Sequence, residues 1–221
     1  MERKLEVISA IKDAVAIGTK NSVSLLLTVV FYVLTIWIPY LNVGTTIAMA
    51  TVPGKLAKGE IINPTFIFDA VYRRRMGSFF LLEGFMVMMM IPAFLFGIIP
   101  AYVLSYMYCL ALYIMIDKDV SPTQALELSN KATYGFKWKI FGVILLFGVL
   151  FYIVFFIVMF ICNAISVGFI TLVLMIAVII LGICCGVALN AVIYRNLFLC
   201  CDEEKAEEVI PTPVQEIPAE F

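Results

Sequence analysis

Few side chains in this sequence are suited to chemistry. The chain has no histidine, the most common general base and metal ligand in proteins. It also has no nucleophile motif, no spacing typical of metal ligands and no phosphate-binding loop. We therefore predict no catalytic residue, no metal and no cofactor, and we expect the protein not to be an enzyme.

Glu83 is the strongest candidate for a functional residue, because it is an acidic residue inside a long apolar stretch. A carboxylate within a membrane helix is costly and is often functional. Since Arg73, Arg74 and Arg75 are close in sequence, we favour a carboxylate at the membrane interface that reaches an arginine or the lipid headgroups. The alternatives are a proton or cation site, or a buried polar contact that holds two helices together.

Three further residues of the last apolar stretch are suited to helix packing. Asn190 is expected to form a hydrogen bond to another helix rather than to bind a substrate. Gly182 and Gly186 have the spacing that lets two helices approach closely. We favour packing within the chain over a homodimer for this pair.

The six cysteines lie in or just after apolar stretches, and we interpret them as small apolar residues rather than disulfide partners. Neighbouring cysteines on a helix point about 100° apart and so rarely bridge each other. They are Cys109, Cys162, Cys184, Cys185, Cys200 and Cys201.

The elements that carry these residues follow from a shortage of charge. Only 14% of the residues are charged, against about 25% in soluble domains. Three stretches, 21–54, 84–116 and 140–194, carry no charge at all, and about 20 apolar residues cross a membrane. Together with a net charge of −1, this excludes a soluble enzyme, a secreted disulfide scaffold and a nucleic-acid binder. We predict an all-α polytopic membrane protein.

Each charge-free stretch is too long for one crossing and contains a helix breaker. The breakers lie at Pro39, at Gly97 with Pro100, and between 162 and 168. We therefore expect three hairpins, each preceded by a cytoplasmic amphipathic helix. Segment 41–57 is weakly apolar, so a short or re-entrant helix shielded by its neighbours is the alternative there. The six expected membrane segments are 22–38, 41–57, 78–97, 99–116, 138–162 and 167–194.

With six crossings, all 15 basic residues lie on one side of the membrane. The positive-inside rule then places both termini in the cytoplasm. Five basic residues beside the segments are candidates for headgroup contacts. We interpret them mainly as topological anchors, with recognition of an anionic lipid as the alternative. They are Arg73, Arg74, Arg75, Lys137 and Lys139.

The polar connectors repeat along the chain. Residues 63–65 (NPT) match residues 121–123 (SPT), and Gly77 matches Gly135 at the same offset. Asn63 or Ser121 is expected to cap a short helix that runs to the matching glycine, and Gln124 to complete a capping box. We expect a single membrane domain, 1–200, built of repeats 5–60, 61–120 and 121–200, followed by a disordered acidic cytoplasmic tail, 201–221.

Several motifs resemble those of a known family. They are ALELS at 125–129, GFKWKIF at 135–141, the turn IPYLNV at 38–43, and Gly59 with Glu60. The chain resembles, over residues 5–200, a broad family of bacterial integral membrane proteins similar to the membrane domain of some glycerophosphodiester phosphodiesterases. The resemblance implies a six-helix protein of the cytoplasmic membrane. The catalytic domain of those enzymes has no counterpart here, so no catalytic residue carries over.

The functional expectation is a non-enzymatic integral membrane protein with a structural, scaffold or lipid-interacting role in a bacterial cytoplasmic (inner) membrane. Membrane lipids are the expected partners, and a protein partner or a second copy of the chain are further candidates. The alternatives are a small transporter or channel component and, in third place, an enzyme that acts on lipids.

The predicted topology is open to a direct test with reporter fusions. A periplasm-reporting enzyme fused after Ile99 and a cytoplasm-reporting fluorescent protein fused after Glu60 should both be active, because six crossings place these positions on opposite sides. Loss of fluorescence at Glu60, with activity of a periplasmic reporter there instead, would contradict the six-crossing topology.

Overall fold

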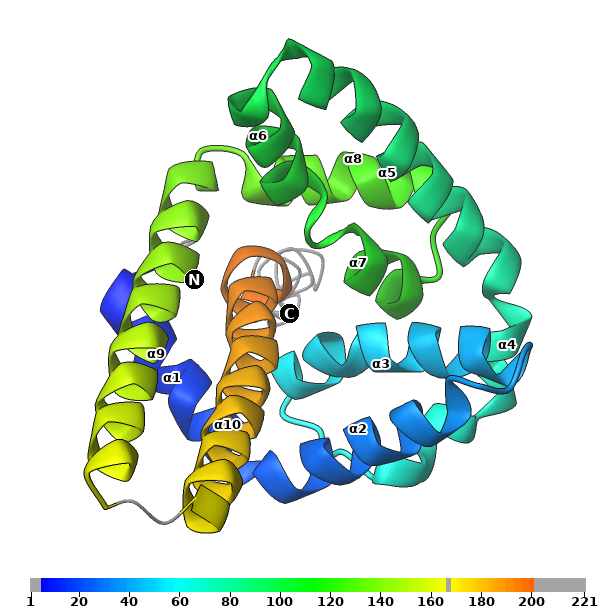
Figure 1. The fold of residues 1–221 in the computed structure, drawn as a ribbon. Coiled ribbons are helices and arrows are strands. Elements are labelled where there is room, and N and C mark those ends of the chain that lie inside the picture. Colours follow the sequence, from blue (N-terminus) through cyan, green and yellow to red (C-terminus); the bar gives the residue numbers. More distant parts are fainter. Residues whose placement is uncertain (1–4, 166–167, 201–221) are drawn as a thin grey trace, which may run out of the picture.

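The computed structural model describes residues 5–165 and 168–200, and this part of the chain is helical without a β-strand (Figure 1). The all-α prediction is therefore confirmed. The α-helices are α1 (Val7–Lys20), α2 (Ser22–Thr35), α3 (Leu41–Ala57), α4 (Ala70–Arg74), α5 (Met76–Phe96), α6 (Ile98–Tyr108), α7 (Ala111–Lys118), α8 (Pro122–Thr133), α9 (Lys137–Ile165) and α10 (Gly168–Tyr194). A 3-10 helix, η1 (Pro64–Phe68), precedes α4, and a π-helical turn, η2 (Arg195–Leu199), follows α10.

Four helical segments among the described residues are long and apolar enough to cross a membrane: Met76–Phe96, Ile98–Lys118, Lys137–Cys162 and Thr171–Leu199. A fifth candidate is α1 with α2, if this pair, bent by 70° at Asn21, counts as one span. Helix α2 has 14 residues and α3 has 17, fewer than the roughly 20 that cross the hydrocarbon layer.

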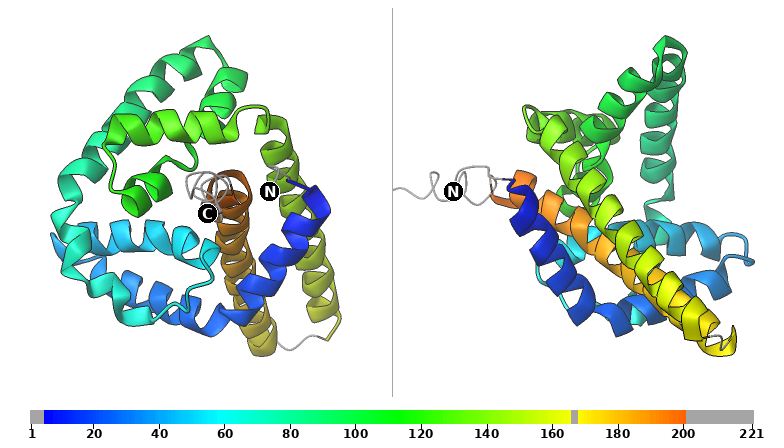
Figure 2. Two further views of the ribbon diagram at one scale, coloured as in Figure 1. Left: turned by 180° about the vertical axis from the view of Figure 1, so that it is seen from behind. Right: turned by 60° about the vertical axis from the view of Figure 1, so that its left-hand side comes forward.

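Consecutive long helices pack side by side as three pairs, α2 with α3, α5 with α6, and α9 with α10. Another helix directly precedes each pair: α1, α4 and α8 respectively (Figure 1). Helix α10 also packs against α1 and α3, so it joins the first and third pairs. In the right-hand view of Figure 2, the closing ends of the pairs lie on the side away from α1.

Helix α3 is shielded by its neighbours, which explains how so weakly apolar a segment is accommodated. Most of its residues are buried, and its polar side chains bond locally. The Thr35 hydroxyl donates to Thr45 Oγ1 over 3.0 Å, and the Thr51 hydroxyl donates to the Ala48 carbonyl over 2.7 Å. These bonds satisfy groups that would otherwise be costly in an apolar interior.

A side chain of α8 bonds to backbone groups that the break between α6 and α7 leaves without a helical partner. The Ser129 hydroxyl donates to the Met107 carbonyl over 2.8 Å and accepts from the Leu110 amide over 3.3 Å. It thereby replaces helix bonds that the break removes. Helices α6 and α7 together form the candidate span Ile98–Lys118.

The predicted helix caps are only partly correct. Ser121 and Gln124 form the expected capping box, and the chain turns at Gly135 with φ of +80°. Asn63, however, caps only the 3-10 helix η1, and Asp69 starts the separate helix α4 because its carboxylate accepts from the Val71 amide. The predicted bend at Gly77 is wrong: Gly77 lies inside α5, and the chain bends at Arg75.

Small residues set two close helix contacts. Gly18 of α1 packs on Cys185 of α10, where an added Cβ would lie 2.9 Å from the Cys185 Cα. The left-hand view of Figure 2 shows α1 crossing this region. A Cβ on Gly182 of α10 would overlap the ring of Phe151 in α9. Gly182 thus lies against another helix of the same chain, whereas a Cβ on Gly186 would have only an ordinary contact with Phe147 at 3.8 Å.

Some predicted features fall outside the described residues. They include the acidic tail 201–221, Cys201, and residues 166–167 at the centre of the third breaker. The other five cysteines are free thiols, as expected.

The contact at Gly182 predicts the effect of a single methyl group. Gly182→Ala should lower the free energy of unfolding by about 1–3 kcal/mol, because Phe151 has to move. The measurement is thermal unfolding followed by the reaction of the buried Cys184 and Cys185 with a thiol-reactive dye. Gly142→Ala in α9 is the matched control, since no atom lies within 4 Å of a Cβ there. Equal effects of the two changes would contradict the packing described.

Candidate functional site

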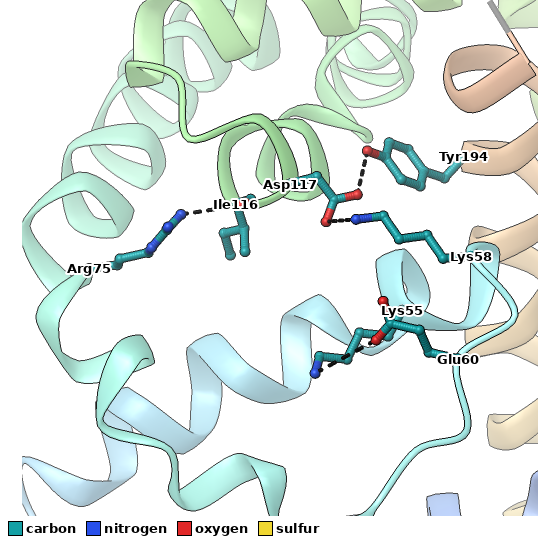
Figure 3. A network of polar contacts seen from close by, with 7 residues as sticks. All are labelled: Lys55, Lys58, Glu60, Arg75, Ile116, Asp117 and Tyr194. Carbon is teal, nitrogen blue, oxygen red and sulfur yellow. Dashed lines mark hydrogen bonds and ion pairs between the residues drawn. The ribbon is translucent and has the colours of Figure 1, made fainter. Parts of the chain in front are cut away.

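A polar junction joins three residues at the ends of α3, α7 and α10 (Figure 3). The Lys58 ammonium, just after α3, lies 2.9 Å from Oδ1 of Asp117 in α7. The hydroxyl of Tyr194, the last residue of α10, donates to Oδ2 of the same carboxylate over 2.8 Å. Asp117 therefore connects segments from all three parts of the chain.

The Tyr194 side chain that forms this hydrogen bond is closely packed. Its side chain is fully buried, its ring stacks on Phe198 at 5.5 Å, and its ring meets Tyr113 edge-on at 5.4 Å. Since a buried hydroxyl without a partner is costly, the Asp117 acceptor is a requirement for this packing.

Further polar contacts surround the junction. Arg75 donates to the Ile116 carbonyl over 3.2 Å and pairs with Asp119 at 3.2 Å. The Lys55 ammonium lies 4.0 Å from the Glu60 carboxylate, and Figure 3 shows the two side chains turned toward each other. Beyond the drawn residues, Arg195 pairs with Asp13 of α1 at 2.6 Å.

The five candidate headgroup residues differ in their surroundings. Arg75 is engaged in the contacts above, and Arg73 donates to the Phe68 carbonyl over 3.3 Å while its stem packs on Gly44. Arg74 is exposed, Lys137 is half-buried, and the exposed Lys139 lies over the Phe136 ring at 5.2 Å. Arg74 and Lys139 are therefore the two most open to a headgroup.

The second feature is a cavity of about 700 Å³ that Glu83 lines. Its walls come from α2, α3, α5, the α6–α7 segment and α10. Glu83 is the single charged side chain among the described residues that line it. The rest are apolar apart from hydroxyl groups and a thiol, and they include Tyr32, Thr46, Met49, Ala50, Pro53, Met86, Val87, Met89, Met90, Leu104, Ser105, Tyr108, Cys109, Leu112, Tyr113 and Val187.

Of the two contacts predicted for Glu83, an arginine or the lipid headgroups, the arginine contact is not present among the described residues, and the headgroup contact stays a prediction. Arg73 and Arg75 bind other groups, and within the described part of the chain no ion pair or hydrogen bond reaches the Glu83 carboxylate. The side chain is half-buried. Instead of meeting the arginines beyond the start of α5, Glu83 lines the cavity.

Asn190 also differs from the prediction. Its amide donates over 3.1 Å to the Gly186 carbonyl in its own helix, and the side chain is exposed. The expected bond to another helix is absent among the described residues. On α8, Glu127 pairs with Lys131, whose hydrogen bond lowers the pKa of the Glu127 carboxyl.

The junction residues were not among the predicted site residues, although the sequence holds a signal for them. Asp117 directly follows the charge-free stretch 84–116, Lys58 follows the first stretch closely, and Tyr194 ends the third. Their equivalent places at the ends of three apolar stretches indicate one common level in the protein. Nothing in the sequence pairs them with each other.

Comparison of the chain with protein-family models, with curated proteins and with solved structures gives no match.

The junction predicts unequal roles for two neighbouring aspartates. Asp117→Ala should lower the free energy of unfolding by roughly 2–3 kcal/mol, because it removes the acceptor of a buried hydroxyl and the partner of Lys58. Asp119→Ala is the control, since its carboxylate is 83% exposed and surface pairs contribute about 1 kcal/mol or less. The thiol-dye unfolding assay measures both. Equal losses would contradict a special role for Asp117.

Proposed function

We propose that this chain is a non-enzymatic integral protein of a bacterial cytoplasmic membrane that binds a lipid-like molecule in the Glu83 cavity. In this proposal the chain has six membrane segments and both termini are cytoplasmic. The charge distribution supports that topology, since it leaves every basic residue on one side. Four apolar helices of sufficient length support membrane insertion.

The observation that carries the proposal is the cavity itself. Its volume of about 700 Å³ lies within the range of roughly 300–1,000 Å³ typical of small-molecule sites. Val87 and Ser105 line it and are exposed. A molecule dissolved in the lipid layer therefore has a route into the cavity between α5 and α6.

The outer surface supports a lipid environment. Helix α9 exposes large apolar side chains along its length, among them Val149, Phe156 and Phe160. At its start, Tyr134 and Trp138 are 76% and 81% exposed. Exposed tyrosine and tryptophan beside an apolar helix are typical of the membrane–water interface.

The shielding of α3 supports its inclusion among the membrane segments. Its buried threonines bond within the helix or to Thr35 of α2. Backbone and polar groups that bond inside the protein are compatible with membrane depth even in a short segment.

A small transporter is the second candidate, and it is favoured because no hydrogen-bond or ion-pair partner of Glu83 lies within residues 5–165 and 168–200. An intramembrane carboxylate that faces a cavity is typical of ion and substrate pathways. Both candidates place the ligand in the same cavity, and they differ in whether it leaves on the opposite side.

The proposed binding site predicts where a hydrophobic probe attaches. A dodecanol probe that carries a photoactivatable diazirine on its chain should label Met86, Met89 or Met90 in protein reconstituted in phosphatidylglycerol nanodiscs. Ala50→Phe should abolish this labelling by filling the cavity, as mass spectrometry of the labelled peptides would report.

Val149→Phe is the control, because it introduces the same phenyl ring on the exposed face of α9. It should leave the cavity labelling unchanged. Labelling confined to outward-facing residues such as Phe156 and Phe160, and insensitive to Ala50→Phe, would refute the proposed function.

A further inference from the structure

We propose that the ligand of the Glu83 cavity is an organic ammonium cation with an apolar chain. The inference rests on the proposed function, because it requires that the cavity holds a ligand. It adds the chemical class of that ligand and assigns Glu83 as the group that recognises its charge.

The first argument is charge. An ionised carboxylate in apolar surroundings is unfavourable unless a cation or several hydrogen-bond donors accompany it. No basic side chain is among the described residues that line the cavity, and Arg75 and Lys58 pair with Asp119 and Asp117. A positively charged ligand supplies the counter-charge that the described residues do not provide.

The second argument is the aromatic lining. Tyr32, Tyr108 and Tyr113 contribute to the walls from three different helices. Tyrosine rings attract cations through their electron-rich faces, and a set of rings around an acidic group is a common way to recognise ammonium groups. Thr46 and Ser105 add hydroxyl groups that accept hydrogen bonds.

The third argument is the remainder of the wall. Met49, Met86, Met89 and Met90 line the cavity. Methionine side chains are flexible and polarisable, and they adapt to apolar ligands of differing shape. An alkyl chain attached to the ammonium group fits this part of the cavity.

Other ligand classes fit less well. An anion would meet the Glu83 carboxylate and no cationic side chain among the described lining residues. A divalent metal ion takes several oxygen ligands, usually with more than one carboxylate. Among the described residues, no three histidine, cysteine or acidic side chains cluster in that way.

The test compares two photoactivatable probes with the same dodecyl chain, one ending in trimethylammonium and the other in hydroxyl. Both are titrated against the full chain in nanodiscs of zwitterionic phosphatidylcholine, which does not concentrate the cationic probe at the surface, with empty nanodiscs subtracted. The cationic probe should label the cavity methionines with a Kd at least roughly tenfold lower than that of the neutral probe.

Variants identify the groups responsible. Glu83→Gln should remove the preference for the cation, whereas Glu83→Asp should retain part of it. Tyr108→Leu should weaken cation binding about threefold or more, and Tyr108→Phe should not, because the ring remains. Glu127→Gln, on the exposed face of α8, is the matched control and should leave both Kd values unchanged. The thiol-dye assay verifies that each variant is folded.

The outcomes separate the two proposals. Equal labelling of the cavity by both probes, or a cation preference that survives in folded Glu83→Gln, would overturn the ammonium inference and leave the proposed function standing. No cavity labelling by either probe would overturn both.

Discussion

The fold depends on how a few polar side chains find hydrogen-bond partners in largely apolar surroundings. Asp117 is the centre of this arrangement, since it accepts the Tyr194 hydroxyl and pairs with Lys58. One residue thereby joins the ends of α3, α7 and α10. In an apolar medium hydrophobic contacts discriminate poorly between helices, so hydrogen bonds and close packing carry more of the specificity. The contact of Gly182 with Phe151 is an example of such packing.

The same constraint makes Glu83 exceptional. The threonines of α3 and Ser129 of α8 all bond to nearby backbone or side-chain groups. Glu83 is ionisable, lies half-buried beside a cavity and has no such partner in the described part of the chain. Tyr113 lines this cavity and also contacts Tyr194, so the cavity and the Asp117 junction share a wall. A proposal for function therefore starts at Glu83 rather than at the better-satisfied junction.

Sequence patterns predicted the structure best where a feature depends on residues close together in the chain. The capping box at Ser121 depends on residues three apart, and the turn at Gly97 depends on a backbone conformation that suits glycine. These patterns predicted the structure less well where the same segment could form a different local hydrogen bond. Asp69 caps a new helix, so the segment from Asn63 breaks into η1 and α4 instead of running to Gly77. Asn190 bonds to its own helix, because the Gly186 carbonyl is within reach.

The sequence by itself determined the all-α class, the apolar stretches and the turns near Pro39 and Gly97, since these follow from charge content and backbone preferences along short segments. Only the tertiary structure decided which polar groups meet. Tyr194 and Asp117 are 77 residues apart in the chain, and no periodicity pairs them. The tertiary structure likewise placed Glu83 at the cavity and away from the arginines that precede it, because helix α5 carries it past them into the space between the helix pairs.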